Sequence, residues 1–228
     1  VDQLPPGTET LSLSGTELRA QLARGESPPT WFTVPEVAAE LRKAYPPRNE
    51  QGFCVFFTGL PASGKSTVAG VLVELLTERL GRPITLLDGD LVRLNLSKGL
   101  GFSKQDRDEN IRRIGFVASE IVKHRGIAIC APIAPYASVR AENRNQIEAL
   151  GGFAEVHVAT PLAVCETRDP KGLYAKARAG EIRGFTGIDD PYEAPQTPEV
   201  RIDTSQQDPE ASALEIVGWL AANGYVSS

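Results

Sequence analysis

Residues 59–67 have the residue types and the spacing of a phosphate-binding loop. They read Gly59-Leu60-Pro61-Ala62-Ser63-Gly64-Lys65-Ser66-Thr67 and match the pattern G-x-x-x-x-G-K-S/T. Glycines let backbone N–H groups approach phosphate oxygens, and the lysine of the pattern reaches the β- and γ-phosphates. The Ser66 hydroxyl would ligate Mg²⁺. The loop therefore predicts a site for a nucleoside triphosphate.

The flanks of this loop provide the context that the motif requires. The apolar run of residues 53–58 is typical of a strand that is buried on both faces. After the loop, apolar residues recur at helical spacing, at Val68, Val71, Leu72, Leu75, Leu76 and Leu80. Gly81 stands where a glycine ends such a helix. Strand, loop and helix in this order make a chance glycine turn a poor alternative.

Two carboxylates follow the next predicted strand, residues 84–87. Ligands of open α/β sheets sit beyond the carboxyl ends of the strands, where Asp88 and Asp90 fall. A carboxylate there can hold Mg²⁺ or accept a proton from an attacking hydroxyl. The alternative interpretation of Asp88-Gly89-Asp90 is a simple turn.

Cationic and aromatic side chains come next along the chain. Arg93, Arg107 and Asn110 lie in two short segments, with Phe102 between them. Arginine forks bind anionic groups, and a phenylalanine can stack on a purine. Taken alone these are weak signals, because surface arginines are usually solvated.

Strands and helices alternate along most of the chain. Further strands are expected at residues 126–131, 153–159 and 200–203, and helices at 106–125, 138–150 and around 214–220. The alternation predicts an α/β fold, a parallel five-stranded sheet with helices on both faces. Residues 169–195 interrupt it, and a long segment rich in Gly, Lys, Arg and Pro is typical of a mobile lid.

Composition limits the class of protein. The net charge of −5 argues against non-specific binding to nucleic acid or anionic membranes. No apolar stretch approaches the ~20 residues of a membrane helix, and no signal peptide is visible. Cys54, Cys130 and Cys165 lack metal-ligand spacing, which indicates buried thiols and a cytoplasmic location. His124 and His157 are isolated, so neither is assigned a catalytic role. The chain has no methionine, so a processed chain or a fragment is expected.

Residues 1–50 differ from residues 51–228. A capped helix is expected from Ser14-Gly15-Thr16-Glu17 and a second helix at residues 37–41, with Pro28-Pro29 between them. Two such helices make a poor independent core. The segment is interpreted either as an extension packed on the main domain or as the tail of a preceding domain, joined by a linker near residues 46–52.

Seven segments, in this order and spacing, resemble adenylyl-sulfate (APS) kinase. They are residues 59–67, 88–93, 100–103, 106–113, 132–136, 168–174 and 180–189. The resemblance runs from about Gly52 to the C-terminus and implies a P-loop nucleoside triphosphate hydrolase-like kinase fold with a lid. In that family ATP phosphorylates the 3′-hydroxyl of adenosine 5′-phosphosulfate (APS) to give 3′-phosphoadenosine 5′-phosphosulfate (PAPS).

The resemblance also implies roles for individual residues. The ATP site would comprise Gly59, Ala62, Ser63, Gly64, Lys65, Ser66, Thr67 and, against the adenine, Arg168. Phe102 and Phe185 would sandwich the APS adenine. The rest of the APS site would comprise Asp90, Arg93, Arg107, Asn110, Ile133, Lys171 and Gly184. Lys65 and Asp88 would be catalytic, with Ser66 and Asp88 at Mg²⁺.

The resemblance carries one departure and two alternatives. Many family members have a serine where this chain has Ala134, which excludes a phosphoserine intermediate at this position. Sulfurylase-fused fungal domains of similar sequence bind PAPS as an inhibitor and have lost kinase activity, but their ATP site is degraded. Another small-molecule kinase would leave the Phe102 and Phe185 segments unexplained.

The N-terminal segment has a resemblance of its own. Residues 13–19, 29–32 and 35–37 look like the end of an ATP sulfurylase catalytic region. In fused proteins of this kind the sulfurylase makes APS and the kinase consumes it. The expected partners are therefore ATP, APS, a fused or upstream sulfurylase domain and further copies of the chain in a dimer or higher homo-oligomer, with no nucleic acid and no membrane.

Overall fold

The structure is a computed structural model that describes residues 10–226, and the chain forms two units, residues 1–50 and 51–228. The first unit contains α1 (Gly15–Ala23), α2 (Pro35–Ala44) and the short 3-10 helix η1 (Arg48–Glu50). Ser14 and Glu17 form the predicted capping box at the start of α1, with bonds of 3.2 and 2.8 Å. Helix α2 begins two residues earlier than predicted, because Pro35 fits the first position of a helix.

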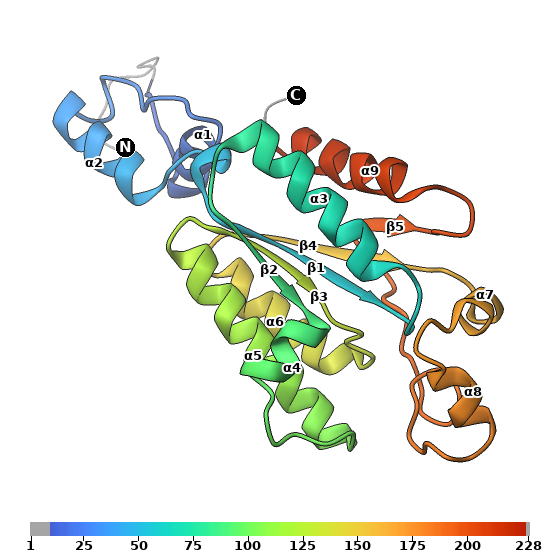
Figure 1. Cartoon of the computed structure of the whole chain (residues 1–228). Helices are drawn as coiled ribbons and strands as arrows, with labels where there is room; N and C mark the ends of the chain where they lie inside the picture. The colour runs from blue at the N-terminus through green and yellow to red at the C-terminus, as the bar shows by residue number, and fades with distance from the viewer. Residues whose placement is uncertain (1–9, 227–228) are drawn as a thin grey trace. The chain divides into compact units, whose positions relative to one another are not determined.

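The second unit is built on a five-stranded parallel sheet. Its strands are β1 (Phe53–Gly59), β2 (Ile84–Asp88), β3 (Ile127–Ala131), β4 (Gly152–Val158) and β5 (Val200–Ile202). They lie in the order β2-β3-β1-β4-β5, and every neighbouring pair is parallel (Figure 1). The predicted fold class is confirmed.

Helices cover both faces of this sheet. On one face lie α3 (Lys65–Leu80) and α9 (Pro209–Ala222), and on the other lie α5 (Lys104–Lys123) and α6 (Ala137–Glu148) (Figure 1). Side chains of β1 alternate between the faces, so Val55 and Phe57 join the first core while Cys54 and Phe56 join the second. The central strand is therefore buried from both sides.

Three short helices lie beyond the carboxyl ends of the strands. They are α4 (Gly89–Asn95), α7 (Leu162–Arg168) and α8 (Leu173–Arg178), and α8 belongs to the segment 169–195 that interrupts the sequence pattern. The sequence pattern did not predict them, since helices of six or seven residues show too few turns for a clear period. Among the described residues, no helix is both long and apolar enough to cross a membrane. Cys54, Cys130 and Cys165 are buried free thiols, as predicted.

The buried histidine of β4 makes stability depend on pH. His157 is 8% exposed, and burial together with Arg201 and Arg140 lowers its pKa from 6.5 to about 4. The unfolded chain therefore binds more protons between these values, so the free energy of unfolding falls as pH drops from 6.5 towards 4. The wild-type protein should therefore lose free energy of unfolding between pH 7 and pH 5. We expect this loss to be about 2 kcal/mol smaller in His157→Gln.

Urea unfolding of both proteins at pH 7 and pH 5 measures this difference. His124→Gln is the matched control, because His124 is exposed at the end of α5. A His157→Gln protein that loses as much stability as the wild type over this pH range would contradict the role given to His157.

Candidate active site

A cavity of about 910 Å³ lies at the carboxyl ends of the strands, at the upper end of the range for small-molecule sites. The loop after β1, the end of β2, the segment after β3 and the segment 168–186 all contribute to its walls. Open α/β sheets place their ligands at this edge, because loops from several strands converge there. The topology therefore puts the chemistry-bearing residues of distant segments into one space.

Most of the predicted site residues line this cavity. They are Ala62, Ser63, Gly64, Lys65, Ser66, Thr67, Asp88, Arg93, Phe102, Arg107, Asn110, Ile133, Arg168, Lys171 and Phe185. Gly59 ends β1 just before the loop, and Gly184 lies in the turn that carries Phe185, where its N–H donates to Asp189 at 2.7 Å. The side chain of Asp90 lies outside the described part of the chain.

The loop depends on glycine at two positions. Gly64 has φ +99° and begins α3, and a Cβ there would lie 3.0 Å from the Thr204 hydroxyl. Gly59 has φ +157°, and a Cβ there would lie 2.7 Å from the Val158 carbonyl oxygen. The loop therefore packs closely against the ends of β4 and β5 and points the N-terminus of the long helix α3 at the cavity, where the helix dipole favours an anion.

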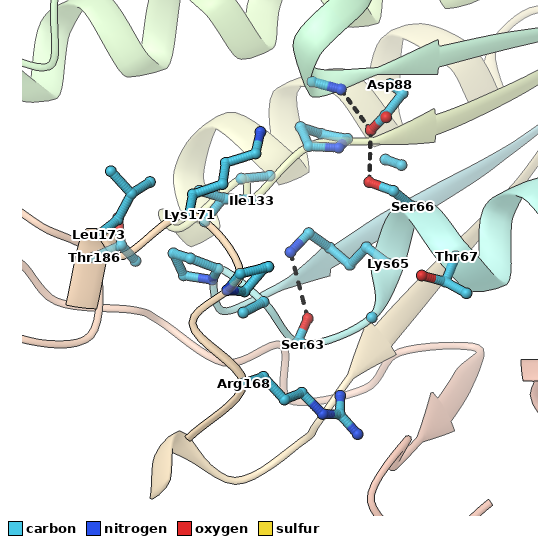
Figure 2. A pocket seen from close by; sticks show the side chains of 18 of the residues that line it. Ser63, Lys65, Ser66, Thr67, Asp88, Ile133, Arg168, Lys171, Leu173 and Thr186 are labelled. Carbon is cyan, nitrogen blue, oxygen red and sulfur yellow. Dashed lines mark hydrogen bonds between the residues drawn. The ribbon is translucent and has the colours of Figure 1, made fainter. Parts of the chain in front are cut away.

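Lys65 lies within the loop and contacts its backbone. Its Nζ donates to the carbonyl oxygens of Gly59 and Leu60 at 3.0 and 2.7 Å, and to the Ser63 hydroxyl at 3.4 Å (Figure 2). Burial lowers the Lys65 pKa to about 8. A phosphate group beside this ammonium would stabilise its charged form. The geometry thus holds a poorly solvated cation where a transferring phosphoryl group would lie.

Ser66, after β1, and Asp88, at the end of β2, bring two oxygen ligands together although β3 lies between these strands in the sheet. The Ser66 hydroxyl donates to Asp88 Oδ1 at 2.8 Å, and the same oxygen accepts the Gly89 N–H at 2.7 Å (Figure 2). Asp88 therefore begins α4, and the interpretation of this segment as a simple turn is wrong. Among the side chains that the structure describes, no cluster of three or more His, Cys, Asp or Glu is suited to a metal. A serine and a carboxylate still fit Mg²⁺, which commonly uses one or two carboxylates, waters and substrate phosphates.

Thr204 supports the phosphate loop, and no feature of the sequence predicted this role. Its hydroxyl donates to the Ser63 carbonyl oxygen at 2.8 Å, and Thr160 donates to the same oxygen at 3.0 Å. The Arg168 guanidinium in turn donates to the hydroxyl and to the carbonyl oxygen of Thr204, both at 2.7 Å. The arginine predicted beside the ATP adenine is thus connected to the phosphate loop through one threonine. No sequence motif marks a threonine after a short strand.

Aromatic and cationic side chains form another part of the cavity wall. The Arg93 guanidinium lies 4.5 Å from the centre of the Phe102 ring, which is 63% exposed. The Phe185 ring packs edge-on against Tyr174 at 4.9 Å between centroids, and the Tyr174 hydroxyl donates to the Pro61 carbonyl oxygen at 3.0 Å. This chain of contacts connects the segment 169–195 directly to the phosphate loop.

A phosphate loop after the central strand of a parallel sheet, with an acidic residue at the end of the edge strand β2, defines a P-loop kinase. The family model for adenylylsulphate kinase matches residues 51–203. The chain therefore belongs to the adenylylsulphate kinase family. The family model for ATP-sulfurylase matches residues 2–44.

Two curated sulfate adenylyltransferases are similar to this chain. The sulfate adenylyltransferase of Chaetomium globosum is 49% identical over 226 residues, which cover 99% of this chain and 39% of that protein. The sulfate adenylyltransferase of Aspergillus oryzae is 50% identical over 224 residues, with 98% and 39% covered. The chain thus spans about two fifths of the length of these curated relatives.

Two solved structures are also similar. A hexameric APS kinase from Thiobacillus denitrificans has a TM-score of 0.80 and 48% identity, covering 99% of this chain and 40% of that one. The Mycobacterium tuberculosis APS kinase CysC, solved in complex with AMPPNP and APS, has a TM-score of 0.71 and 44% identity. That comparison covers 75% of this chain and 98% of the other.

Proposed function

We propose that this chain transfers the γ-phosphoryl group of ATP to the 3′-hydroxyl of APS, giving PAPS and ADP in sulfate assimilation. The observation that carries the proposal is the shared cavity, which unites a complete phosphate loop with an aromatic and cationic wall. Family membership and the APS kinase solved with AMPPNP and APS support the same reaction.

The donor half of the site acts by position and charge. Lys65 stabilises negative charge on the transferring group, and the N-terminus of α3 adds partial positive charge. Ser66 and Asp88 would hold Mg²⁺, which would supply positive charge to offset the negative charge of the phosphate groups. Arg168 would lie against the ATP adenine while its contact with Thr204 keeps the loop in place.

The acceptor half binds a purine and an anion. Phe102 and Phe185 would stack on the adenine of APS, and Arg93, Arg107 and Asn110 would bind its phosphosulfate and ribose. Ile133 and Lys171 complete this part of the cavity wall. Asp88 lines the cavity at the end of β2 and would accept the proton of the attacking hydroxyl.

Ala134 favours direct transfer between the two nucleotides. It is fully buried at φ +45°, and its carbonyl oxygen accepts bonds from Thr58 at 3.1 Å and from Arg140 at 2.8 Å. A methyl side chain offers no hydroxyl to carry a phosphoryl group. The reaction therefore proceeds in line, without a covalent intermediate at this position.

We further propose that residues 1–50 are the C-terminal tail and linker of a sulfurylase-like region, and that residues 51–228 are the kinase domain. The ATP-sulfurylase match to residues 2–44 and the sulfate adenylyltransferase relatives support this division. A fused sulfurylase would supply APS directly. The hexameric relative supports a homo-oligomer, and three buried free thiols support a cytoplasmic location.

A coupled assay of ADP release with ATP and APS tests the proposed reaction. We expect turnover with APS and none with AMP, shikimate or gluconate as acceptors. AMP lacks only the sulfate of APS, which makes it the sharpest control. Tight PAPS binding without turnover would instead identify a regulatory module, and turnover with another acceptor would identify a different kinase.

We expect residues 169–195 to act as a lid that orders when nucleotides bind. The segment carries Lys171, Lys176, Arg178 and Arg183, which would close over anionic ligands. Its glycines at positions 180, 184 and 187 all have φ between +67° and +91°, a backbone geometry that favours glycine. Hydrogen exchange with and without ADP plus APS measures the ordering, with the buried strand β3 as internal control. Equal protection of the segment in both states would refute the lid.

A further inference from the structure

Asp190 connects the segment 169–195 to the body of the kinase unit. It closes the turn that begins at Phe185, since its N–H donates to the Phe185 carbonyl at 3.2 Å and its carbonyl accepts the Gly187 N–H at 2.8 Å. Its carboxylate accepts one bond from Arg107 at 2.9 Å and bonds from the Tyr136 hydroxyl at 2.9 and 2.8 Å. The side chain is 20% exposed, so these partners largely replace water.

The Tyr136 side of this contact is rigid. Tyr136 is 2% exposed, packs in the core under α5 and immediately precedes α6. Because its ring cannot move without disturbing that core, its hydroxyl fixes the position of the Asp190 carboxylate. Asp190 is thus held against a fixed point, although it belongs to a segment with little regular structure of its own.

The Arg107 side of the contact faces the cavity. Nε donates to the Phe102 carbonyl at 3.0 Å, Nη1 donates to Asp190 and to the Thr186 hydroxyl at 2.5 Å, and Nη2 donates to the Gly184 carbonyl. A guanidinium has five N–H groups, so four of them meet acceptors of the chain and one remains for a ligand. Arg107 therefore joins the Phe102 segment to the Phe185 turn, and Asp190 is the charged partner that orients it.

We propose that Asp190 is a positioning residue of the acceptor site. Its carboxylate, anchored by Tyr136, fixes Arg107 and the Phe185 turn in the arrangement that accepts an adenine nucleotide with an anionic 5′-group. The proposal rests on the proposed function, since it explains how the two aromatic residues and the arginine are held in register. In this proposal Asp190 affects how tightly the acceptor binds and does not take part in phosphoryl transfer.

The neighbouring aspartate provides a matched control. Asp189 accepts the N–H groups of Gly184 and Phe185 at 2.7 and 2.6 Å, so it stabilises the same turn through the backbone. No hydrogen bond or ion pair joins its described side chain to Arg107 or Tyr136. A change at Asp189 therefore weakens the turn, whereas a change at Asp190 also releases the arginine.

Steady-state kinetics of Asp190→Asn test the proposal. We expect the KM for APS to rise about 10-fold, with kcat and the KM for ATP within about twofold of the wild type. Asp190→Glu, which keeps the charge, should recover part of the lost affinity, and Tyr136→Phe should shift the APS KM in the same direction by less. A rise in both KM values, or an equal rise in Asp189→Asn, would assign Asp190 a merely structural role.

A double-mutant cycle shows whether Asp190 acts through Arg107. In the Arg107→Ala background, we expect Asp190→Asn to change kcat/KM for APS by less than about twofold, because its target is already gone. If the two substitutions each lower kcat/KM for APS and their factors multiply in the double mutant, the proposal is overturned.

Failure of the proposed function has a different signature. A wild-type protein that neither binds nor phosphorylates APS would refute the reaction alone. In that case hydrogen exchange of the ligand-free proteins decides the positioning role, since Asp190→Asn should speed exchange of the Gly187 and Asp190 amides. Unchanged exchange would then overturn the proposal.

Discussion

Replacing Lys65 with alanine should lower kcat on the order of 10²-fold or more while leaving the fold intact. Phosphoryl transfer depends on positive charge that is already in place where negative charge spreads in the transition state. The structure holds this ammonium against the loop carbonyls of Gly59 and Leu60, in a position that water reaches poorly. Measurement of kcat at saturating ATP and APS gives the effect directly.

The fold of this variant should survive, because the removed group is a buried charge with a lowered pKa. Thermal unfolding and circular dichroism check this point. Lys123→Ala is the control for loss of a lysine, since Lys123 is exposed at the end of α5 and pairs only with Glu120 in the described structure. Near wild-type turnover in Lys65→Ala would show that the phosphate loop is not the catalytic site.

Replacing Arg107 with alanine should lower kcat/KM for APS by about 10- to 100-fold, since a charged hydrogen bond is worth ~1.5–3 kcal/mol and each 1.4 kcal/mol is tenfold. The variant loses the N–H group that faces the cavity and frees both the Phe102 and Gly184 carbonyls. The KM for ATP should stay nearly unchanged, because the phosphate loop has its own supports in Thr160 and Thr204.

Arg112→Ala is the matched control for this experiment. Arg112 lies on the same helix, but it is half-exposed and pairs with Glu142 at 2.7 Å on the surface. Its removal should leave both KM values unchanged. If Arg107→Ala raises the ATP KM and spares APS, the donor and acceptor halves of the cavity have been assigned the wrong way round.

The sheet could be predicted from the sequence because its strands are buried on both faces. Such strands appear as continuous apolar runs, and the predicted run at residues 53–58 ends within one residue of the observed β1. The start of α5 was placed two residues late, because residues 104–110, which follow the Ser103 cap, include no apolar side chain to start a helical period. Strong local patterns were therefore enough for the fold but not for element ends.

The supports of the site could not be predicted in this way. Arg107 and Asp190 are 83 positions apart, and Thr204 is 141 positions from the Ser63 carbonyl that it holds. Motifs and periodicity report neighbours along the chain, whereas these contacts exist only once the topology has brought strand ends together. Resemblance to a family singled out Arg107 and left out the partner that orients it.

The support that Thr204 gives to the phosphate loop makes nucleotide affinity depend on the outermost strand. β5 has three residues and lies at the edge of the sheet, and Thr204 follows it by two residues. Edge elements open at a lower free-energy cost than central ones, and each opening withdraws the hydroxyl from Ser63. Closure of this edge and occupation of the donor site are thus linked equilibria, so each stabilises the other by the same amount. Thr204, far from the glycine-rich motif in sequence, then sets part of the ATP dissociation constant through the support that it gives to that motif.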